Sequence, residues 1–169
     1  MSSPQILKDF FRSNDKFEFL RALKNLEFEK SFKKLTQLIS HPTFKSLAFN
    51  KLNLPKSYNE LGSNSNIFYS NNIQGELAWT LLSILNYKNE INTFLDLEKQ
   101  FQKNLLLSNY ELCFNLLDKI EQNICFSIWT LEHKFSLKQK INGNEENWSF
   151  LQEINNETKN PKVLFFAHF

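Results

Sequence analysis

Glycine and proline are scarce in this sequence, with three Gly and four Pro among 169 residues. These residues make most tight turns, and an all-β sandwich or barrel needs many of them. The shortage therefore argues against a many-turned β fold. It favours long helices joined by short linkers rich in Asn and Ser, and we predict an all-α protein.

Long apolar runs and thiols are also few. No stretch approaches the roughly 18 uninterrupted apolar residues of a membrane span. The start of the chain has no apolar run followed by a small-residue cleavage site. We therefore expect no membrane association, no secretory signal and a cytoplasmic location. The two cysteines, Cys113 and Cys125, stand among apolar neighbours. We expect buried free thiols, and a disulfide between them is an open alternative.

Motifs that carry chemistry are missing as well. The glycines are isolated, so they make no phosphate-binding loop, and no Cys-x-x-Cys or His-x-x-x-His pair offers zinc-ligand spacing. No serine stands in a nucleophile-elbow pattern. We expect no catalytic residue, no metal and no cofactor. An enzyme or toxin with a sparse Glu, His and Lys site is an open alternative.

What the chain has in abundance is phenylalanine, with 18 Phe in a composition that is 41% hydrophobic. In residues 1–55 the apolar positions recur at helical spacing. They predict four short helices: Pro4 to Arg12, Asp15 to Lys24, Glu27 to Ile39 and Thr43 to Leu52. Ser3 and Asp15 are the expected N-caps of the first two.

Residues 56–72 are polar and lack periodicity, which predicts a long loop or linker that either holds a short helix or is functional. A helix from Gly75 to Tyr87 follows, and the side chains expected to face inward are Leu77, Ala78, Leu81, Leu82 and Leu85. We therefore predict an N-terminal helical subdomain over 1–55, a linker over 56–72, helical hairpins over 73–160 and an apolar tail over 161–169.

The second half of the chain repeats itself with a shift of 34 residues. The segment Leu97-Glu98-Lys99-Gln100-Phe101 aligns with Leu131-Glu132-His133-Lys134-Phe135. In the same register Ser108-Asn109 aligns with Asn142-Gly143, so turn residues meet turn residues. Two copies of a helix–turn–helix unit follow, over 91–124 and 125–158. The side chains that we predict to form their core are Leu97, Phe101, Phe114, Leu117, Leu131, Phe135, Trp148 and Leu151.

This helical hairpin resembles the tetratricopeptide repeat, which has the same 34-residue period. The bulky residues just named, with Phe94 and Ile128, stand where that family places its packing residues. The chain departs from the family at Glu98 and Glu132, where the family has a small residue, and it lacks the terminal proline. The resemblance implies a solenoid of stacked helix pairs with a surface that binds a protein partner. Two similar hairpins in an ordinary bundle are the other interpretation.

Two carboxylates and one histidine are candidate interface residues. Glu98 and Glu132 occupy the same repeat position, so they would form a ladder along one groove and bind a basic partner. In the alternative, each lies on a solvated face near a lysine, although neither has an ideal i, i+4 partner. His133 follows Glu132 on the same predicted helix, where it either belongs to a site or faces solvent.

The first 60 residues are basic, with eleven Lys and Arg against six Asp and Glu, whereas the rest holds nine against twelve. Lys30, Lys33 and Lys34 cluster on one predicted helix and could contact phosphate groups of a nucleic acid. Glu27 and Glu29 are interleaved with them, which favours a solvated helix face instead.

The tail after Pro161 is rich in large apolar residues and predicts a strand or a short apolar helix. It would dock on its own helices or on a second subunit, or the natural chain would continue beyond it. Taken together, the sequence predicts a helical-hairpin solenoid or bundle that serves as a protein-binding or scaffold module, with a homo-oligomer as an option. A nucleic-acid-associated helical protein is the alternative function.

Overall fold

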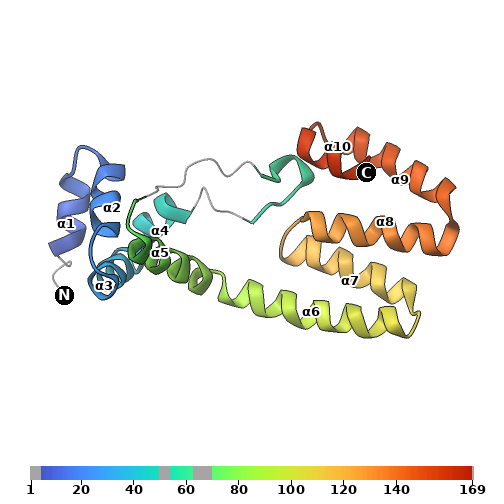
Figure 1. Cartoon of the computed structure of the whole chain (residues 1–169), viewed down its shortest axis with the longest axis horizontal. Coiled ribbons are helices and arrows are strands. Elements are labelled where there is room, and N and C mark those ends of the chain that lie inside the picture. Colours follow the sequence, from blue (N-terminus) through green and yellow to red (C-terminus); the bar gives the residue numbers. More distant parts are fainter. Residues whose placement is uncertain (1–4, 50–53, 63–69, 169) are drawn as a thin grey trace. The chain divides into compact units, whose positions relative to one another are not determined.

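The structure is a computed structural model that describes residues 5–49, 54–62 and 70–168. These residues form ten α-helices and no strand, which confirms the predicted all-α class (Figure 1). In chain order the helices are α1 (Gln5–Arg12), α2 (Lys16–Lys24), α3 (Phe28–Ile39), α4 (Pro42–Phe49), α5 (Ile73–Asn86), α6 (Lys88–Leu106), α7 (Tyr110–Asn123), α8 (Ile128–Asn142), α9 (Asn144–Glu157) and α10 (Pro161–Ala167). None of the described helices is both long and apolar enough to cross a membrane.

The chain divides into two compact units. The first holds α1 to α5, and the second holds residues 54–62 together with α6 to α10, with the boundary at the start of α6. This grouping differs from the predicted boundaries in two respects. The helix after the linker belongs with the N-terminal helices, and the first part of the predicted linker belongs with the C-terminal helices.

The first unit has a core of aromatic and leucine side chains. The ring of Phe10 is buried and meets the rings of Phe44 and Phe19 edge to face, with centroids 4.9 and 5.7 Å apart. The predicted cap at Asp15 is confirmed, because its carboxylate accepts hydrogen bonds from the backbone N–H groups of Phe17 and Glu18. The predicted cap Ser3 lies outside the described residues.

Helix α5 packs against the end of α2 at very short range. A Cβ atom on Gly75 would lie 1.7 Å from the backbone oxygen of Lys24, so only glycine permits this approach. The ammonium group of Lys24 is buried there and donates to both carboxylate oxygens of Glu76, at 2.9 and 3.0 Å. Burial disfavours the charged form and lowers the pKa of Lys24, against the opposing effect of Glu76.

The predicted inward face of α5 is wrong in part. Ala78 and Leu82 are buried, whereas Leu77, Leu81 and Leu85 are exposed. The helix is apolar on nearly every side, so its periodicity does not select a face. The small residues at 75 and 78 decide which side can approach α2 and α3.

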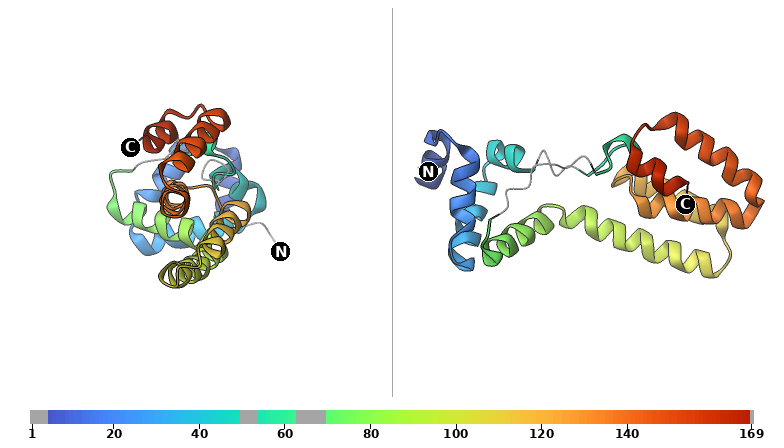
Figure 2. Two further views of the ribbon diagram at one scale, coloured as in Figure 1. Left: turned by 90° about the vertical axis from the view of Figure 1, so that its right-hand side faces the viewer. Right: turned by 45° about the horizontal axis from the view of Figure 1, so that its top comes forward.

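In the second unit, successive helices run antiparallel and lie beside one another (Figure 1 and the right-hand view of Figure 2). Tyr110 and Asn123 bound α7, and Asn144 and Glu157, each 34 positions later, bound α9. The turns before these two helices both use a left-handed φ, 58° at Ser108 and 76° at Gly143. The chain is therefore an all-helical protein with consecutive packed helix pairs.

The first helices of the two pairs pack on each other through aromatic rings. The indole of Trp129 in α8 meets Phe94 and Phe101 of α6, with centroids 5.4 Å apart in each case. Among the predicted core residues, Phe101, Leu117, Leu131 and Leu151 are buried. The half-buried ones are Leu97, Phe114 and Phe135. The prediction for Trp148 is wrong, because this side chain is 65% exposed.

Residues 54–62 form a strap that is bound to the second unit by polar contacts. Tyr58 opens a short 3-10 turn and is buried against Phe126, with ring centroids 4.9 Å apart. The side chain of Asn160 donates to the backbone oxygens of Tyr58 and Leu61. Asn59 donates to the backbone oxygen of Glu157. This part of the predicted linker is thus a structural element of the second unit.

The apolar tail forms a short helix rather than a strand. Asn160 caps α10 by accepting from the backbone N–H of Lys162, and Pro161 starts the helix, where its missing N–H costs nothing. Val163 is fully buried among residues of α8 and α9. The tail therefore docks on helices of its own chain, while Phe165 and Phe166 remain exposed.

Candidate functional site

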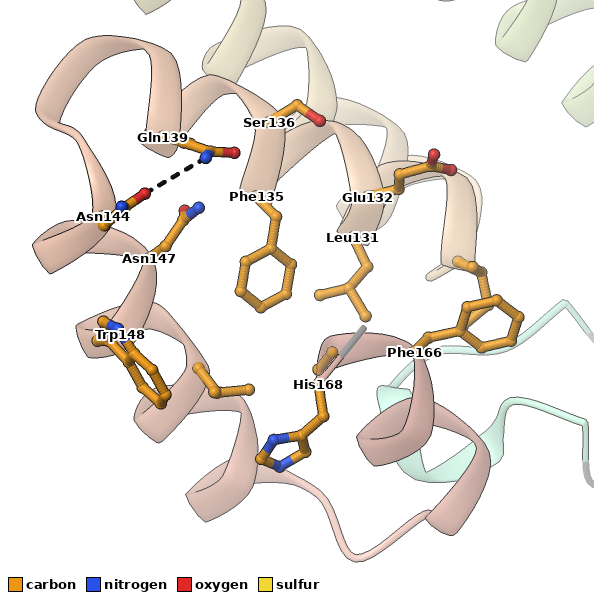
Figure 3. Close-up of a pocket in the computed structure, with 13 residues that line it drawn as sticks. Leu131, Glu132, Phe135, Ser136, Gln139, Asn144, Asn147, Trp148, Phe166 and His168 are labelled. Carbon is orange, nitrogen blue, oxygen red and sulfur yellow. Dashed lines mark hydrogen bonds between the residues drawn. The ribbon is translucent and has the colours of Figure 1, made fainter.

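A groove of about 540 Å³ lies between α8, α9 and α10 (Figure 3). Its apolar lining consists of Ile128, Leu131, Phe135, Trp148, Leu151, Phe166 and Ala167. Leu131 and Leu151 are buried, and Phe135 is half-buried. Above them stand Trp148 and Phe166, which are 65% and 55% exposed. The groove thus has a packed apolar floor between two aromatic side chains that are each more than half exposed.

The arrangement follows from the lengths of the helices. α8 presents Leu131 and Phe135 on one face, and α9 covers part of that face with Phe150 and Ile154. The third side is α10, which spans seven residues and contributes one fully buried side chain, Val163. The other described residues do not cover the rest of the face.

Polar side chains lie at both ends of the groove, with Ser136 between them on α8 and His168 on the side of α10 (Figure 3). Figure 3 shows the carboxylate of Glu132 near Phe166, while Gln139, Asn144 and Asn147 lie near Trp148. Gln139 donates to the side-chain oxygen of Asn144 at 3.3 Å. The side-chain oxygen of Asn147 is buried and has no hydrogen-bond partner among the described residues. An unsatisfied buried oxygen costs about 1–3 kcal/mol, which a ligand that donates a hydrogen bond would recover.

Glu132 carries the only carboxylate that lines the groove in the described part of the chain. It is exposed, and none of the ion pairs between described residues includes it. The three lysines of the same helix are engaged elsewhere: Lys134 pairs with Asp118 and Glu121, Lys138 pairs with Glu146, and Lys140 lies over the ring of Tyr110. The groove therefore presents an unneutralised negative charge at one end.

A second polar cluster lies under the strap, away from the groove. Glu121 is buried, accepts a hydrogen bond from the hydroxyl of Tyr58 at 2.9 Å and pairs with Lys134. Lys134 also pairs with Asp118 at 2.8 Å. Burial is the largest effect on Lys134 and opposes its charge, but the two carboxylates together outweigh it and raise its pKa. Burial and the negative charge of Glu121 raise the pKa of Tyr58 far above its ordinary value.

This second cluster holds the fold rather than offering reactive groups. The ammonium group of Lys134 is held in its charged form, so it is a poor nucleophile. Its two carboxylate partners are Asp118 and Glu121, and Glu121 also accepts the hydrogen bond of Tyr58. Among the described residues, no group of three or more His, Cys, Asp and Glu side chains is placed to hold a metal ion. The two cysteines are free, with Cys113 buried and Cys125 half-buried.

The candidate interface residues fall at different places. Glu132 lines the groove, but Glu98 lies half-buried on α6 and does not, so the groove holds no ladder of the two. Nδ1 of His133 lies 2.9 Å from the backbone oxygen of Trp129, and its ring lies against Phe101 and Trp129. His133 thus faces the packing between α6 and α8.

The basic residues of the first unit lie on α3. Lys30, Lys33 and Lys34 are exposed, and Lys30 pairs with Glu27 at 3.1 Å. The interleaved acidic residue therefore neutralises part of the positive surface, as the solvated-face interpretation requires.

Sequence reasoning did not identify Gln139, Asn147 or Phe166 as site residues. Their signal was present in a weak form. Trp148 stands in a polar segment three positions before Leu151, and the tail adds three phenylalanines after Pro161. Only the packing of α10 brings these residues together. Comparison of the chain with family models, curated proteins and solved structures gave no match.

Proposed function

We propose that this chain is a protein–protein interaction module whose α8–α9–α10 groove receives an apolar segment of a partner. In this proposal the pairs α6–α7 and α8–α9 are tetratricopeptide-like repeats. The shared 34-residue spacing and the stacking of α6 on α8 support it. Arrays of helix pairs commonly bind partners on the surfaces that their stacking creates.

The main observation behind the proposal is that the groove combines a buried apolar floor with exposed aromatic side chains at its edges. Trp148 and Phe166 are exposed beside the buried Leu131 and Leu151. Tryptophan and phenylalanine in such positions are typical anchors of binding surfaces, because their burial by a partner removes a large apolar area from water. The groove volume of about 540 Å³ falls within the usual range for binding sites.

Site-specific photo-crosslinking in native cells tests the proposal. A benzophenone amino acid at position 166 should crosslink a discrete protein partner. The control places the same probe at Leu112 of α7, which is 51% exposed, close to the 55% of Phe166, but lies outside the groove. A crosslink that appears at 166 and not at 112 supports the proposal.

Trp148→Ala should abolish the crosslink from position 166 while leaving the protein folded, because this side chain is largely exposed. Identical crosslinks at both positions, or a crosslink that survives Trp148→Ala, would contradict a role for the groove.

A further inference from the structure

The groove runs along a single face of α8. Its lining residues on this helix are Ile128, Leu131, Glu132, Phe135, Ser136 and Gln139. They recur at alternating steps of three and one, which is the spacing of one helical face over three turns. At 1.5 Å per residue this face is roughly 16 Å long. A partner helix of three turns has the same length.

The described part of the site offers helices on its three sides and no strand edge. A partner segment therefore has no sheet to extend, and an apolar helix face laid into the groove is the recognition mode that matches the helical spacing of its lining. Anchors at i, i+3 or i+4 and i+7 of such a helix would match the floor residues Leu131 and Phe135, which are themselves one turn apart.

The two ends of the groove differ in charge. Glu132 at one end has no ion-pair partner among the described residues, whereas Gln139, Asn144 and Asn147 at the other end are neutral amides. Complementarity therefore places a cationic side chain of the partner near Glu132. At the other end, the amide of Asn147 can rotate to present its unsatisfied oxygen to a donor on the partner.

We infer, building on the proposed function, that the partner segment is a basic amphipathic helix of about three turns, with a Lys or Arg beside Glu132 and bulky apolar residues over Leu131 and Phe135. The charge sets the direction in which the helix lies along α8. An acidic helix of the same apolar pattern would place like charges together and bind more weakly.

Selection from a displayed library of random 14-residue peptides, with the full chain as bait, tests this inference. Parallel selection against Trp148→Ala identifies the peptides that depend on the groove. We expect the selected peptides to carry apolar residues at i, i+3 or i+4 and i+7, together with at least one flanking Lys or Arg. Groove-dependent winners that are acidic, or that lack helical spacing, would overturn the inference and leave the proposed function standing. An absence of any groove-dependent winner would count against both.

A charge reversal then tests the role of Glu132. Glu132→Arg should weaken the selected basic peptides by roughly five- to tenfold and should favour their counterparts with Glu in place of Lys or Arg. The control is Glu98→Arg, the same change at the same repeat position but outside the groove, which should alter neither affinity. Equal effects of the two substitutions, measured by fluorescence anisotropy of labelled peptides, would overturn the assignment of the charge to Glu132.

Discussion

The two helix pairs of the second unit share a sequence pattern but differ in what covers them. Phe101 of the first pair is fully buried, whereas its repeat equivalent Phe135 is half-buried in the groove. In the same way Phe114 is half-buried, whereas its equivalent Trp148 is exposed. The first pair is covered by α8, a helix of 15 residues, and the second by α10, a helix of seven. The burial of a repeat position therefore depends on the helix that packs beside it, and the described helices leave more of the second pair exposed than of the first.

The largest expected effect contrasts the two phenylalanines. Phe101→Ala should cost about 3–5 kcal/mol of unfolding free energy, because it empties a closed site. Phe135→Ala should cost less, about 2 kcal/mol, because its ring already borders the open groove. Hydrogen exchange of the amides in α7 and α9, read by mass spectrometry, measures both. Equal costs would show that the difference in cover between the pairs has no energetic meaning.

A second contrast concerns a repeat position that holds a half-buried lysine in the second pair and an uncharged residue in the first. Lys134 aligns with Gln100 in the 34-residue register. Lys134→Met should cost about 3 kcal/mol, because it leaves the buried carboxylate of Glu121 without its counter-charge. Gln100→Met, the matched change on an exposed position, should stay within about 0.5 kcal/mol. Denaturant unfolding followed by circular dichroism separates these outcomes. A small loss of unfolding free energy in Lys134→Met would mean that Glu121 is not buried.

The same cluster predicts how stability depends on alkaline pH. The ordinary pKa values of Tyr58 and Lys134 are 10.0 and 10.5, and both are raised in the fold. Above these values the unfolded chain loses protons that the folded chain keeps, so stability falls as pH rises. The contribution of both groups is fully present below about pH 10.

Tyr58→Phe should flatten this alkaline decline. It should also cost about 1–2 kcal/mol at neutral pH, since the buried oxygen of Glu121 loses a donor. The measurement is the free energy of unfolding in urea at several pH values from 7 to 11. A variant that declines as steeply as the parent would remove Tyr58 from this explanation.

The last contrast, between the turns of the two pairs, includes the smallest expected effect. Gly143 has φ 76° and ψ −163°, a region that is nearly reserved for glycine, so Gly143→Ala should cost about 2 kcal/mol. Its added Cβ would meet no atom within 4 Å, so the cost is backbone strain alone. Ser108→Gly should instead gain about 0.5 kcal/mol by relieving the left-handed φ of a non-glycine residue. Thermal unfolding measures both changes: we expect a lower melting temperature for Gly143→Ala and a higher one for Ser108→Gly.

Much of the fold was predictable because it depends on local spacing. The cap at Asp15, the repeat register that aligns α7 with α9 and the break at Pro161 all follow from nearby residues. The candidate site was less predictable, because it depends on which elements meet. The sequence contains Trp148 and the tail phenylalanines, but no local pattern states how α10 packs against α8 and α9. The prediction of the buried face of α5 failed for a similar reason, since apolar residues occupy both sides of this helix.

The strap has a consequence for the order in which the chain folds during synthesis. Tyr58 and Leu61 are bound by Asn160, so contacts that complete the second unit join residues about a hundred positions apart. At a synthesis rate of 5–20 residues per second, residue 160 is added roughly 5–20 s after residue 58. During that interval Tyr58 lacks its contact with Asn160. For more than half of the interval it also lacks Glu121, which accepts its hydroxyl hydrogen bond. Completion of this unit therefore waits until Asn160 has been added, and a chain that stops before this residue lacks the contacts that hold Tyr58 and Leu61.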